Sequence, residues 1–283
     1  MTVLPATARS AGPQPPPAPL ELPLELRPPP GFSAQVRQCF ARRAHGYDQQ
    51  ALLQRAVAWR LAGLARDLPL PPGPCADLGA GSGLLSRALL QRCPDLRDRP
   101  PLQLDLCPEL LARNPIAAAS PGGPLPPSDL NDPLPPRLAG AALFVSSFAL
   151  QWLERPAASL GHGCEQLAPG GWLLLALPVA GSFDAWHQAA AAAAVPFTGL
   201  PLPPAQELIA AAAPWLELRP PQRLCFSRHG CDGLDTLRLL AGLGATASRQ
   251  PPLNAGQLRR LLRHWPSGAS LRWEVLLLLG RRR

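Results

Sequence analysis

The sequence contains no lysine, so all 27 of its basic residues are arginine. Charged residues make up only 16% of the 283 residues, and aromatic residues only 5%. No apolar run approaches the roughly 18 residues that a membrane-spanning helix needs, which argues against a membrane protein. With 47% hydrophobic residues the chain can bury a sizeable core, and its length suits one large α/β domain or a domain with a cap.

The sequence also lacks a recognisable metal-binding or disulfide pattern. Its seven cysteines are odd in number and form no C-x-x-C pair. Only the run CFSRHGC at residues 225–231 combines two cysteines, Cys225 and Cys231, with a histidine, His229, and the isolation of this cluster argues against a metal site. We therefore expect no metal, and we expect reduced, mostly buried thiols in a cytoplasmic protein.

Proline, in contrast, is abundant, with 39 residues. Ten of these prolines fall within residues 1–31, which contain no apolar segment of the kind that a signal peptide has. We interpret residues 1–31 as a disordered, proline-rich leader and residues 32–283 as the folded domain.

Charge is unevenly distributed along the chain. Residues 32–66 and 218–283 carry net charges of +5 and +9, whereas residues 67–217 carry −6. Basic ends of this kind suggest an anionic partner, which could be a nucleic acid, a membrane surface or an acidic protein. Alternatively, the arginines only keep surface helices soluble.

The spacing of apolar residues predicts strands that alternate with helices, which is typical of a parallel α/β sheet. One strand is expected to end at Asp77, and further strands are expected over 102–106, 143–147, 172–177, 223–226 and 271–279. Helices are expected from near Ser33 through Tyr47 and over 51–68, 84–92, 185–195, 204–213, 234–243 and 254–264. Asn254 is the expected N-cap of the last helix. The proline-rich stretch 115–137 shows no clear pattern.

The clearest chemical signal is the sequence CADLGAGSG at residues 75–83, between an expected strand and an expected helix. Glycines at such a turn let the backbone approach a ligand closely. The pattern D-x-G-x-G-x-G differs from the G-x-G-x-x-G dinucleotide fingerprint, and its acid, Asp77, would repel a pyrophosphate. The acid instead suits a ligand with a cationic end, such as the amino group or sulfonium of S-adenosylmethionine. A plain tight turn is the alternative.

Two further carboxylates support a nucleoside ligand. Asp105 ends the next expected strand, 22 residues after Gly83, close to the spacing of about 20 that is typical of a ribose-binding acid. Asp129, in the loop expected after a third strand, could accept a hydrogen bond from an adenine amino group. Each acid could also be an ordinary strand-end or loop residue. Together, the glycine turn and Asp105 predict a nucleoside cofactor.

With these motifs the chain resembles the class I S-adenosylmethionine-dependent methyltransferases, whose seven-stranded sheet has an antiparallel last strand. Three segments resemble the malonyl-acyl carrier protein O-methyltransferases of biotin synthesis more closely. Residues 40–47 (FARRAHGY) are similar to that family's F-x-R-A-A-x-x-Y helix, and residues 146–152 (SSFALQW) to its S-N-x-x-x-Q-W segment. Residues 238–246 (RLLAGLGAT) are similar to its R-x-L-K-x-I-G-A-T cap segment.

The resemblance implies a Rossmann-like α/β fold with a seven-stranded methyltransferase sheet and a helical cap formed by insertions in the C-terminal half. We expect N-terminal helices over 32–68, a cofactor-binding core over 69–180, and acceptor-side helices with the closing strands over 181–283. S-adenosylmethionine is the implied cofactor. The residues expected to bind it are Tyr47, Asp77, Gly79, Ala80, Gly81, Gly83, Asp105, Leu106, Asp129, Leu130 and Ser146.

The implied reaction is methyl transfer to the free carboxylate of malonyl-acyl carrier protein, which gives the malonyl methyl ester that starts pimeloyl synthesis for biotin. A carboxylate is already ionised at neutral pH, so no general base is needed. We therefore expect catalysis by alignment of the two reactants, without a catalytic triad. His187 lies in a stretch similar to the family's G-S…H-Q, as a helix-face residue or as a contact to the acceptor.

The basic ends suit an acidic carrier protein as partner, and malonyl-coenzyme A is left open as the acceptor. A methyltransferase that acts on a small molecule or on nucleic acid is an alternative. Nucleic acid is disfavoured because the sequence has no aromatic-rich basic stretch and no base-flipping motif. A non-catalytic adenosyl-binding partner is the third reading, but it would predict an eroded glycine turn, and that turn is intact.

Overall fold

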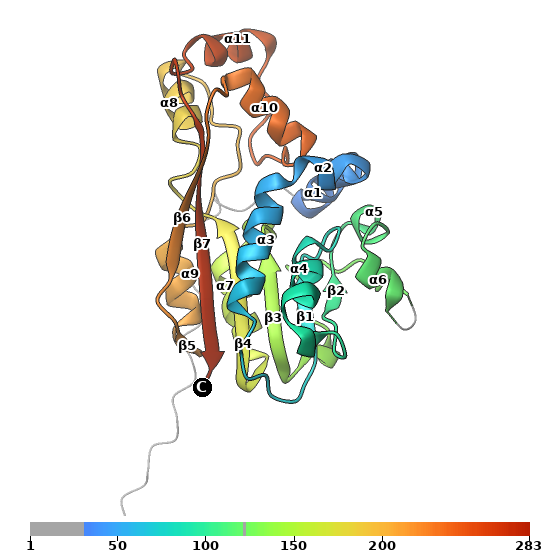
Figure 1. The fold of residues 1–283 in the computed structure, drawn as a ribbon. Coiled ribbons are helices and arrows are strands. Elements are labelled where there is room, and N and C mark those ends of the chain that lie inside the picture. The colour runs from blue at the N-terminus through green and yellow to red at the C-terminus, as the bar shows by residue number, and fades with distance from the viewer. Residues whose placement is uncertain (1–30, 121–122) are drawn as a thin grey trace, which may run out of the picture.

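A computed structural model describes residues 31–120 and 123–283 of the chain. The expected disordered leader therefore lies outside the described residues, except for Gly31. The described residues form a mixed sheet with helices on both of its faces and further helices beyond one end of its strands (Figure 1). This architecture confirms the α/β fold that the sequence predicts.

The sheet has seven strands in the order β2-β1-β3-β4-β7-β5, and β6 also pairs with β7. Strands β1 to β4 run parallel to one another, whereas β7 runs antiparallel to β4, β5 and β6. The last strand is thus the antiparallel one, as the resemblance implies. The strands are β1 (Cys75–Leu78), β2 (Leu102–Leu104), β3 (Ala141–Ser147), β4 (Leu167–Pro178), β5 (Leu216–Leu218), β6 (Gln222–Arg228) and β7 (Leu271–Arg282).

Helices α3 and α4 cover one face of the sheet, and α7 and α9 cover the other (Figure 1). The α-helices are α1 (Phe32–Ala41), α2 (Tyr47–Gln50), α3 (Leu52–Leu64), α4 (Leu84–Arg92), α5 (Pro108–Leu111), α6 (Pro115–Ala119), α7 (Pro156–Glu165), α8 (Asp184–Ala192), α9 (Ala205–Ala212), α10 (Gly233–Gly242) and α11 (Ala255–Arg263). None of them has both the length and the apolar character needed to cross a membrane, within the described parts of the chain.

The central strands β3, β4 and β7 are buried along most of their length because helices cover both faces of the sheet. The continuous apolar sequences of β4 and β7, rather than alternating ones, match this two-sided burial. Leu174 and Leu175, adjacent in β4, are both fully buried and pack into the clusters on opposite faces of the sheet.

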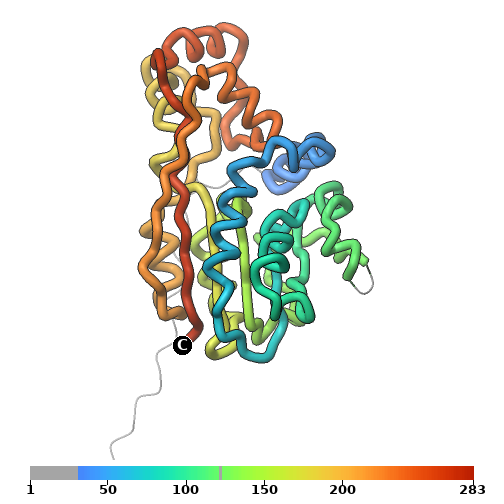
Figure 2. Tube along the Cα trace, in the orientation of Figure 1, coloured from blue at the N-terminus to red at the C-terminus, as the bar shows by residue number. Residues whose placement is uncertain are grey.

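Helices α8, α10 and α11 form a cap beyond the carboxyl ends of the parallel strands (Figure 1). Strands β6 and β7 form a long ribbon that reaches from the sheet to this cap, which is easiest to follow along the trace in Figure 2. As the sequence predicts, Asn254 caps α11, and it does so in a reciprocal pair of hydrogen bonds with Gln257.

The proline-rich stretch between β2 and β3 forms no strand among its described residues, which leaves β2 at the edge of the sheet. Proline lacks the N–H group that a strand ladder needs, so this composition opposes a further parallel strand beside β2. One backbone hydrogen bond, from the Ser128 N–H to the Asp105 carbonyl at 2.8 Å, attaches the loop to the end of β2. At the other side of the sheet, β5 and β6 pair with successive parts of β7.

The expectation of one continuous helix from Ser33 through Tyr47 is wrong. Helix α1 ends at Ala41, a 3-10 turn spans Ala44–Gly46, and Tyr47 begins the short helix α2. The bend brings the ring of Tyr47 edge-on to that of Phe40, with 6.2 Å between the ring centroids.

We predict that Leu174→Ala lowers the free energy of unfolding by about 2–5 kcal/mol, because it leaves a cavity in the fully buried centre of the sheet. Leu52→Ala is the matched control, since Leu52 is 61% exposed. Urea unfolding followed by circular dichroism measures both variants. Equal stability of the two variants would contradict the assignment of β4 to the core.

Candidate functional site

A cavity of about 920 Å³, a volume that includes space open to solvent, lies at the carboxyl ends of β1, β2 and β3. The loops that follow these three strands line it, together with residues of the helices α1 to α5. Strand β1 lies between β2 and β3, so the loops after it and after its neighbours diverge there. Ligands of open α/β sheets bind at such a switch point.

Most of the residues predicted to bind the cofactor come together in this cavity. Those that line it are Tyr47, Asp77, Gly79, Ala80, Gly81, Asp105, Leu106, Asp129 and Leu130. Gly83 and Ser146 are absent from its lining. The pattern-based selection therefore identifies one continuous site from segments that are far apart in the sequence.

The two exceptions support the site from outside the cavity. Gly83 precedes α4 with a φ of 85°, and a Cβ atom there would lie 2.5 Å from the Asn114 Oδ1 atom. The Ser146 hydroxyl donates a hydrogen bond to the Leu78 carbonyl at 2.6 Å, between β3 and β1. Both residues therefore hold the loops of the site in place, and their role as cofactor contacts stays a prediction.

The glycine turn is fastened to the end of the neighbouring strand. The Gly79 and Ala80 N–H groups donate to the Leu104 carbonyl at 2.8 and 2.9 Å, and the Gly81 N–H donates to Asp105 Oδ2 at 2.7 Å. A Cβ atom on Gly79 would lie 2.1 Å from the Ala149 Cβ, whereas one on Gly81 would have no neighbour closer than 3.9 Å. The turn thus packs against protein at Gly79 and faces the cavity at Gly81.

Asp105 is held by backbone donors on both of its carboxylate oxygens. Oδ2 accepts from the Gly81 N–H and Oδ1 accepts from the Cys107 N–H, each at 2.7 Å. Burial raises the pKa of Asp105, and these backbone hydrogen bonds oppose that rise. Each oxygen retains a further lone pair, so the carboxylate can accept two hydrogen bonds from a vicinal diol.

Asp77 is the most buried acid of the cavity, with 1% of its surface exposed. Burial raises its pKa to about 7, and a hydrogen bond from the Ser86 hydroxyl at 2.6 Å opposes this rise. A cation next to Asp77 would favour the ionised carboxylate. The environment of Asp77 therefore suits a positively charged ligand group.

Asp129 belongs to a small cluster organised by Asn131, a residue that the sequence analysis missed. Asp129 Oδ1 accepts from the Asn131 backbone and side-chain N–H groups at 2.9 and 2.8 Å. The Asn131 side chain also donates to Ser33 at 3.1 Å and accepts from the Glu154 N–H at 2.8 Å. One side chain therefore joins α1, the proline-rich loop and the segment after β3.

Asp48 was also missed, although it follows Tyr47 directly. Its carboxylate accepts a hydrogen bond from the Ser82 hydroxyl and forms an ion pair with Arg87 at 2.6 Å. These contacts fasten α2 to the start of α4, so that Tyr47 lies over the glycine turn. Burial, together with the charges of Asp105 and Asp48, raises the pKa of Tyr47, which keeps its phenol neutral.

A second cavity, of about 630 Å³, adjoins the first and extends towards the cap. The two share the residues Phe40, Tyr47, Gln54, Phe148 and Trp152. Aromatic rings from α8 and β7 line its far side, and no arginine contributes to its lining among the described residues. The described lining of this second cavity is mainly apolar and aromatic and contains no charged residue.

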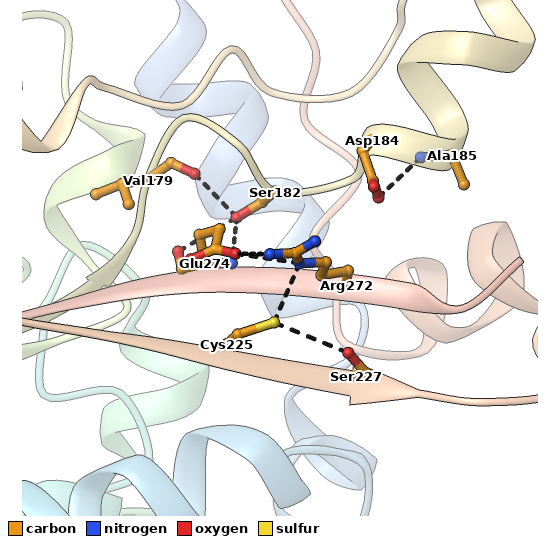
Figure 3. A network of polar contacts seen from close by, with 8 residues as sticks. All are labelled: Val179, Ser182, Asp184, Ala185, Cys225, Ser227, Arg272 and Glu274. Atoms are coloured by element: carbon orange, nitrogen blue, oxygen red, sulfur yellow. Dashed lines mark hydrogen bonds and ion pairs between the residues drawn. The ribbon is translucent and has the colours of Figure 1, made fainter.

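A group of polar contacts joins the cap to the sheet behind the second cavity (Figure 3). The Ser182 hydroxyl donates to the Val179 carbonyl at 2.9 Å and accepts from the Glu274 N–H at 2.9 Å. On the neighbouring side, Arg272 pairs with Glu274 at 2.5 Å and donates to the Cys225 sulfur at 3.1 Å. These contacts attach the segment before α8 to β7.

His187 lies on the exposed face of α8 and stacks on Phe197, with 3.7 Å between the ring centroids. It does not line either cavity. The helix-face alternative for His187 therefore fits its position. In the described residues, no group of three histidine, cysteine or acidic side chains could hold a metal ion.

We predict that Gly81→Asn abolishes binding of the expected adenosyl cofactor and preserves the fold, because asparagine tolerates the φ of 51° and its side chain would enter the cavity. Gly79→Asn should instead lower the melting temperature, because its Cβ would overlap with Ala149. Calorimetry and thermal denaturation test this contrast. Unchanged cofactor affinity in Gly81→Asn would contradict the assignment of the cavity.

Comparisons with known proteins support the fold and the resemblance that the sequence predicts. The chain is 33% identical over 234 residues to the biotin biosynthesis bifunctional protein BioCD of Bordetella avium, a match that covers 81% of this chain and 48% of that protein. It is 37% identical over 173 residues to the malonyl-acyl carrier protein O-methyltransferase of Alcanivorax borkumensis, with 58% and 53% of the two chains covered. The chain thus spans about half the length of these curated relatives. No protein-family model matches it.

Among solved structures, the chain is similar to a crystal structure of an S-adenosylmethionine-dependent methyltransferase from Anabaena variabilis, with a TM-score of 0.57. The match covers 91% of this chain and 97% of that one at 14% identity, a level that supports the fold alone. The chain therefore has the class I S-adenosylmethionine-dependent methyltransferase fold, and its predicted resemblance to the malonyl-acyl carrier protein O-methyltransferases is confirmed.

Proposed function

We propose that the chain transfers a methyl group from S-adenosylmethionine to the free carboxylate of a malonyl thioester on acyl carrier protein. The names of its relatives support this substrate. The observation that carries the proposal is the adjacency of two cavities that share Tyr47 and Phe148. The first is lined by three acids, Asp77, Asp105 and Asp129, together with Arg37, and the second has no charged residue in its described lining. Such a pair can hold a charged nucleoside cofactor and an acyl group end to end.

The residues of the first cavity fit S-adenosylmethionine. Asp105 offers two oriented acceptors to the ribose hydroxyls, and Asp129 offers an acceptor to the adenine amino group. Leu106 and Leu130 give the adenine ring apolar walls. Asp77 and the open space at Gly81 suit the cationic methionine end and the close approach of the backbone.

Bound S-adenosylmethionine supplies an electrophilic methyl group, so that transfer forms one carbon–oxygen bond and breaks one carbon–sulfur bond without moving a proton. The protein therefore needs to align the acceptor and exclude water, and no side chain has to act as a base. Tyr47 and Phe148, which line both cavities, are placed where the two reactants would meet.

The second cavity suits a carboxylate that must remain nucleophilic. A buried arginine would pair with the acceptor oxygens and lower their reactivity, and no arginine lines this cavity among the described residues. Buried polar atoms without a hydrogen-bond partner occur on residues that line it, namely Gln54, Gln151 and Trp186. Of these atoms only the Trp186 Nε1–H is a donor, so it is the candidate neutral partner for an oxygen of the acyl group. The uncharged ester product is compatible with the aromatic lining.

The proposed macromolecular partner is the acidic carrier protein. Arg259, Arg260 and Arg263 are exposed on α11 of the cap, and they belong to the C-terminal region with a net charge of +9. Long-range attraction of this kind acts mainly on the rate of encounter. Malonyl-coenzyme A, which presents the same acyl group without the protein, is the alternative acceptor.

The proposal places the enzyme in the cytoplasm. All seven cysteines are free, and Cys75, Cys93, Cys107, Cys164 and Cys231 are buried. Free thiols persist in a reducing compartment.

The decisive experiment is transfer of a labelled methyl group to malonyl-acyl carrier protein, malonyl-coenzyme A and bulk RNA, assayed side by side. The proposal predicts label on a malonyl thioester in a base-labile methyl ester. Label on RNA, or no transfer by a protein that binds S-adenosylmethionine, would contradict it and favour the nucleic-acid or the non-catalytic alternative.

We predict that Asp105→Ala weakens S-adenosylmethionine binding at least about tenfold, since each hydrogen bond to a charged group contributes about 1.5–3 kcal/mol. The variant also frees the Gly81 and Cys107 N–H groups that Asp105 holds. Asp98→Ala, which removes an exposed acid away from the cavity, is the control. Titration calorimetry measures both. A loss below twofold in Asp105→Ala would mean that the acid only closes the strand end.

We predict that the KM for malonyl-acyl carrier protein rises severalfold when the salt concentration increases from about 0.05 M to about 0.5 M, where the Debye length is roughly 4 Å. The KM for malonyl-coenzyme A should change less. Replacing Arg259, Arg260 and Arg263 with glutamine should have the same effect as salt, without placing acids at the C-terminal end of α11.

The matched control replaces three exposed arginines that precede β1, β2 and β3, at the opposite end of the sheet: Arg66, Arg97 and Arg137. This triple variant should keep the wild-type KM for both acceptors. Equal salt sensitivity for the carrier protein and coenzyme A substrates would contradict electrostatic recruitment through α11.

A further inference from the structure

A row of buried polar side chains lies beneath the glycine turn. Asp77, Ser86, Gln103 and Asn114 come from β1, α4, β2 and the start of α6, and each is at least 98% buried. Buried polar side chains need hydrogen-bond partners, and these four satisfy one another. Only Asp77 belongs to the lining of the cofactor cavity.

The hydrogen bonds between them point in one direction. The Asn114 side-chain N–H donates to Gln103 Oε1 at 2.8 Å, and the Gln103 side-chain N–H donates to the Ser86 hydroxyl at 2.9 Å. The Ser86 hydroxyl in turn donates to Asp77 Oδ2 at 2.6 Å. Each of these three side chains thus directs one hydrogen bond along the row towards the Asp77 carboxylate, an arrangement in which successive hydrogen bonds strengthen one another. Gln103 Nε2 also donates to the Pro101 carbonyl at 2.6 Å, which holds the Gln103 amide in place.

At its other end, this series of hydrogen bonds also reaches the glycine turn. The Asn114 side-chain N–H donates to the Gly81 carbonyl at 3.3 Å, and the Gly81 N–H is held by Asp105. Asn114 therefore contacts the one glycine of the turn whose α-carbon faces open cavity. Two separate parts of the cofactor site, the Asp77 carboxylate and the Gly81 peptide, share a single support.

We propose that Gln103 and Asn114, acting through Ser86, are positioning residues that fix the Asp77 carboxylate and the Gly81 peptide in the arrangement that binds the cationic end of the cofactor. This inference rests on the cofactor of the proposed function. Neither residue lines the cavity, so both act through Asp77 and Gly81.

The charges around Asp77 make its protonation sensitive to this support. Asp105, at the end of β2, raises the pKa of Asp77, and the Ser86 hydrogen bond lowers it. Asp48 on α2 and Arg87 on α4 lie over the same turn and neutralise each other in an ion pair, and Tyr47 stays neutral. Loss of the Ser86 hydroxyl bond leaves the Ser86 backbone hydrogen bond to oppose burial and Asp105, so the pKa of Asp77 rises.

Cofactor binding should therefore depend on pH. Binding of a cation requires ionised Asp77, so affinity increases as the pH rises through the pKa of Asp77, near 7. When the donor chain is broken, the same increase moves to higher pH. A residue with a purely structural role would lower stability without moving this profile.

Three variants test the inference. Gln103→Met keeps the side-chain length and removes the donor to Ser86. Asn114→Asp keeps the oxygen that caps α6 through the Ile116 and Ala117 N–H groups, and it removes the donors to Gln103 and Gly81. Ser86→Ala removes the last donor and favours the helix in which it lies, so it gives a folded variant in any case.

Two substitutions of the same chemistry serve as controls. Gln222→Met changes an exposed glutamine of β6, and Asn254→Asp changes the N-cap of α11. Both lie away from the cofactor cavity. They report the general effect of a lost amide on stability.

The measurements are calorimetric affinity for S-adenosylmethionine between pH 5.5 and 8.5, melting temperature, and the Asp77 carboxyl titration by carbon-13 NMR in the free protein, assigned with Asp77→Asn. We expect each test variant to bind about fivefold more weakly at pH 7.5, the effect of about one net hydrogen bond. The midpoint of the affinity profile and the Asp77 titration should both move to higher pH in Ser86→Ala and Gln103→Met. In both controls the affinity profile and the Asp77 titration should match those of the wild type.

Unchanged affinity and an unchanged Asp77 titration in Ser86→Ala and Gln103→Met would overturn the inference. A wild-type protein that fails to bind S-adenosylmethionine would overturn the proposed function instead. The NMR titration needs no cofactor, so the two failures are distinguishable.

Discussion

The attachment of the glycine turn to the end of β2 is the constraint on which the site depends. Gly79 and Ala80 donate to the Leu104 carbonyl, and Gly81 donates to the Asp105 carboxylate. These bonds place an acid from each of two neighbouring strands in one cavity and fix the direction in which Gly81 faces. Asp77 and Asp105 repel each other across this short distance, so the turn also concentrates negative charge where a cationic ligand would compensate it.

The N-terminal segment and the proline-rich loop complete the cavity by contacts that span the sequence. Asp48 binds Ser82 and Arg87, and Asn131 joins Ser33 to Glu154. The loop needs such a clamp because its prolines oppose a further parallel strand beside β2, and the backbone hydrogen bond from Ser128 to Asp105 attaches it at the end of that strand. A side-chain cluster thus replaces a strand ladder in holding Asp129 at the cavity.

The distinction between local sequence patterns and contacts with distant segments explains which parts of the site the sequence predicts and which it does not. Asp77, the glycine turn and Asp105 follow from local patterns, because a strand end, a turn and a helix start each have a recognisable composition. Asp48 and Asn131 have partners in distant segments, and no local pattern indicates such partners. Strand β5 is defined by its pairing with the distant strand β7, and the bend before Tyr47 brings its ring against that of Phe40. Gly83 and Ser146 belong to the segments that resemble the family, yet neither lines the cavity, and their contacts hold its loops in place.

The two cavities also explain how one fold can combine opposite demands on charge. The cofactor side gathers acids that favour a cation, while the acceptor side contains no arginine among its described lining residues. An anionic acceptor in an apolar cavity is destabilised by lost solvation, and the nearest compensating charge is the cation of the cofactor itself. Attraction between the two reactants would then draw the carboxylate towards the methyl group, so that the protein gains alignment from the charge of its own cofactor. An arginine in the second cavity would compete with this attraction, which gives a physical reason for the lack of arginine in its described lining.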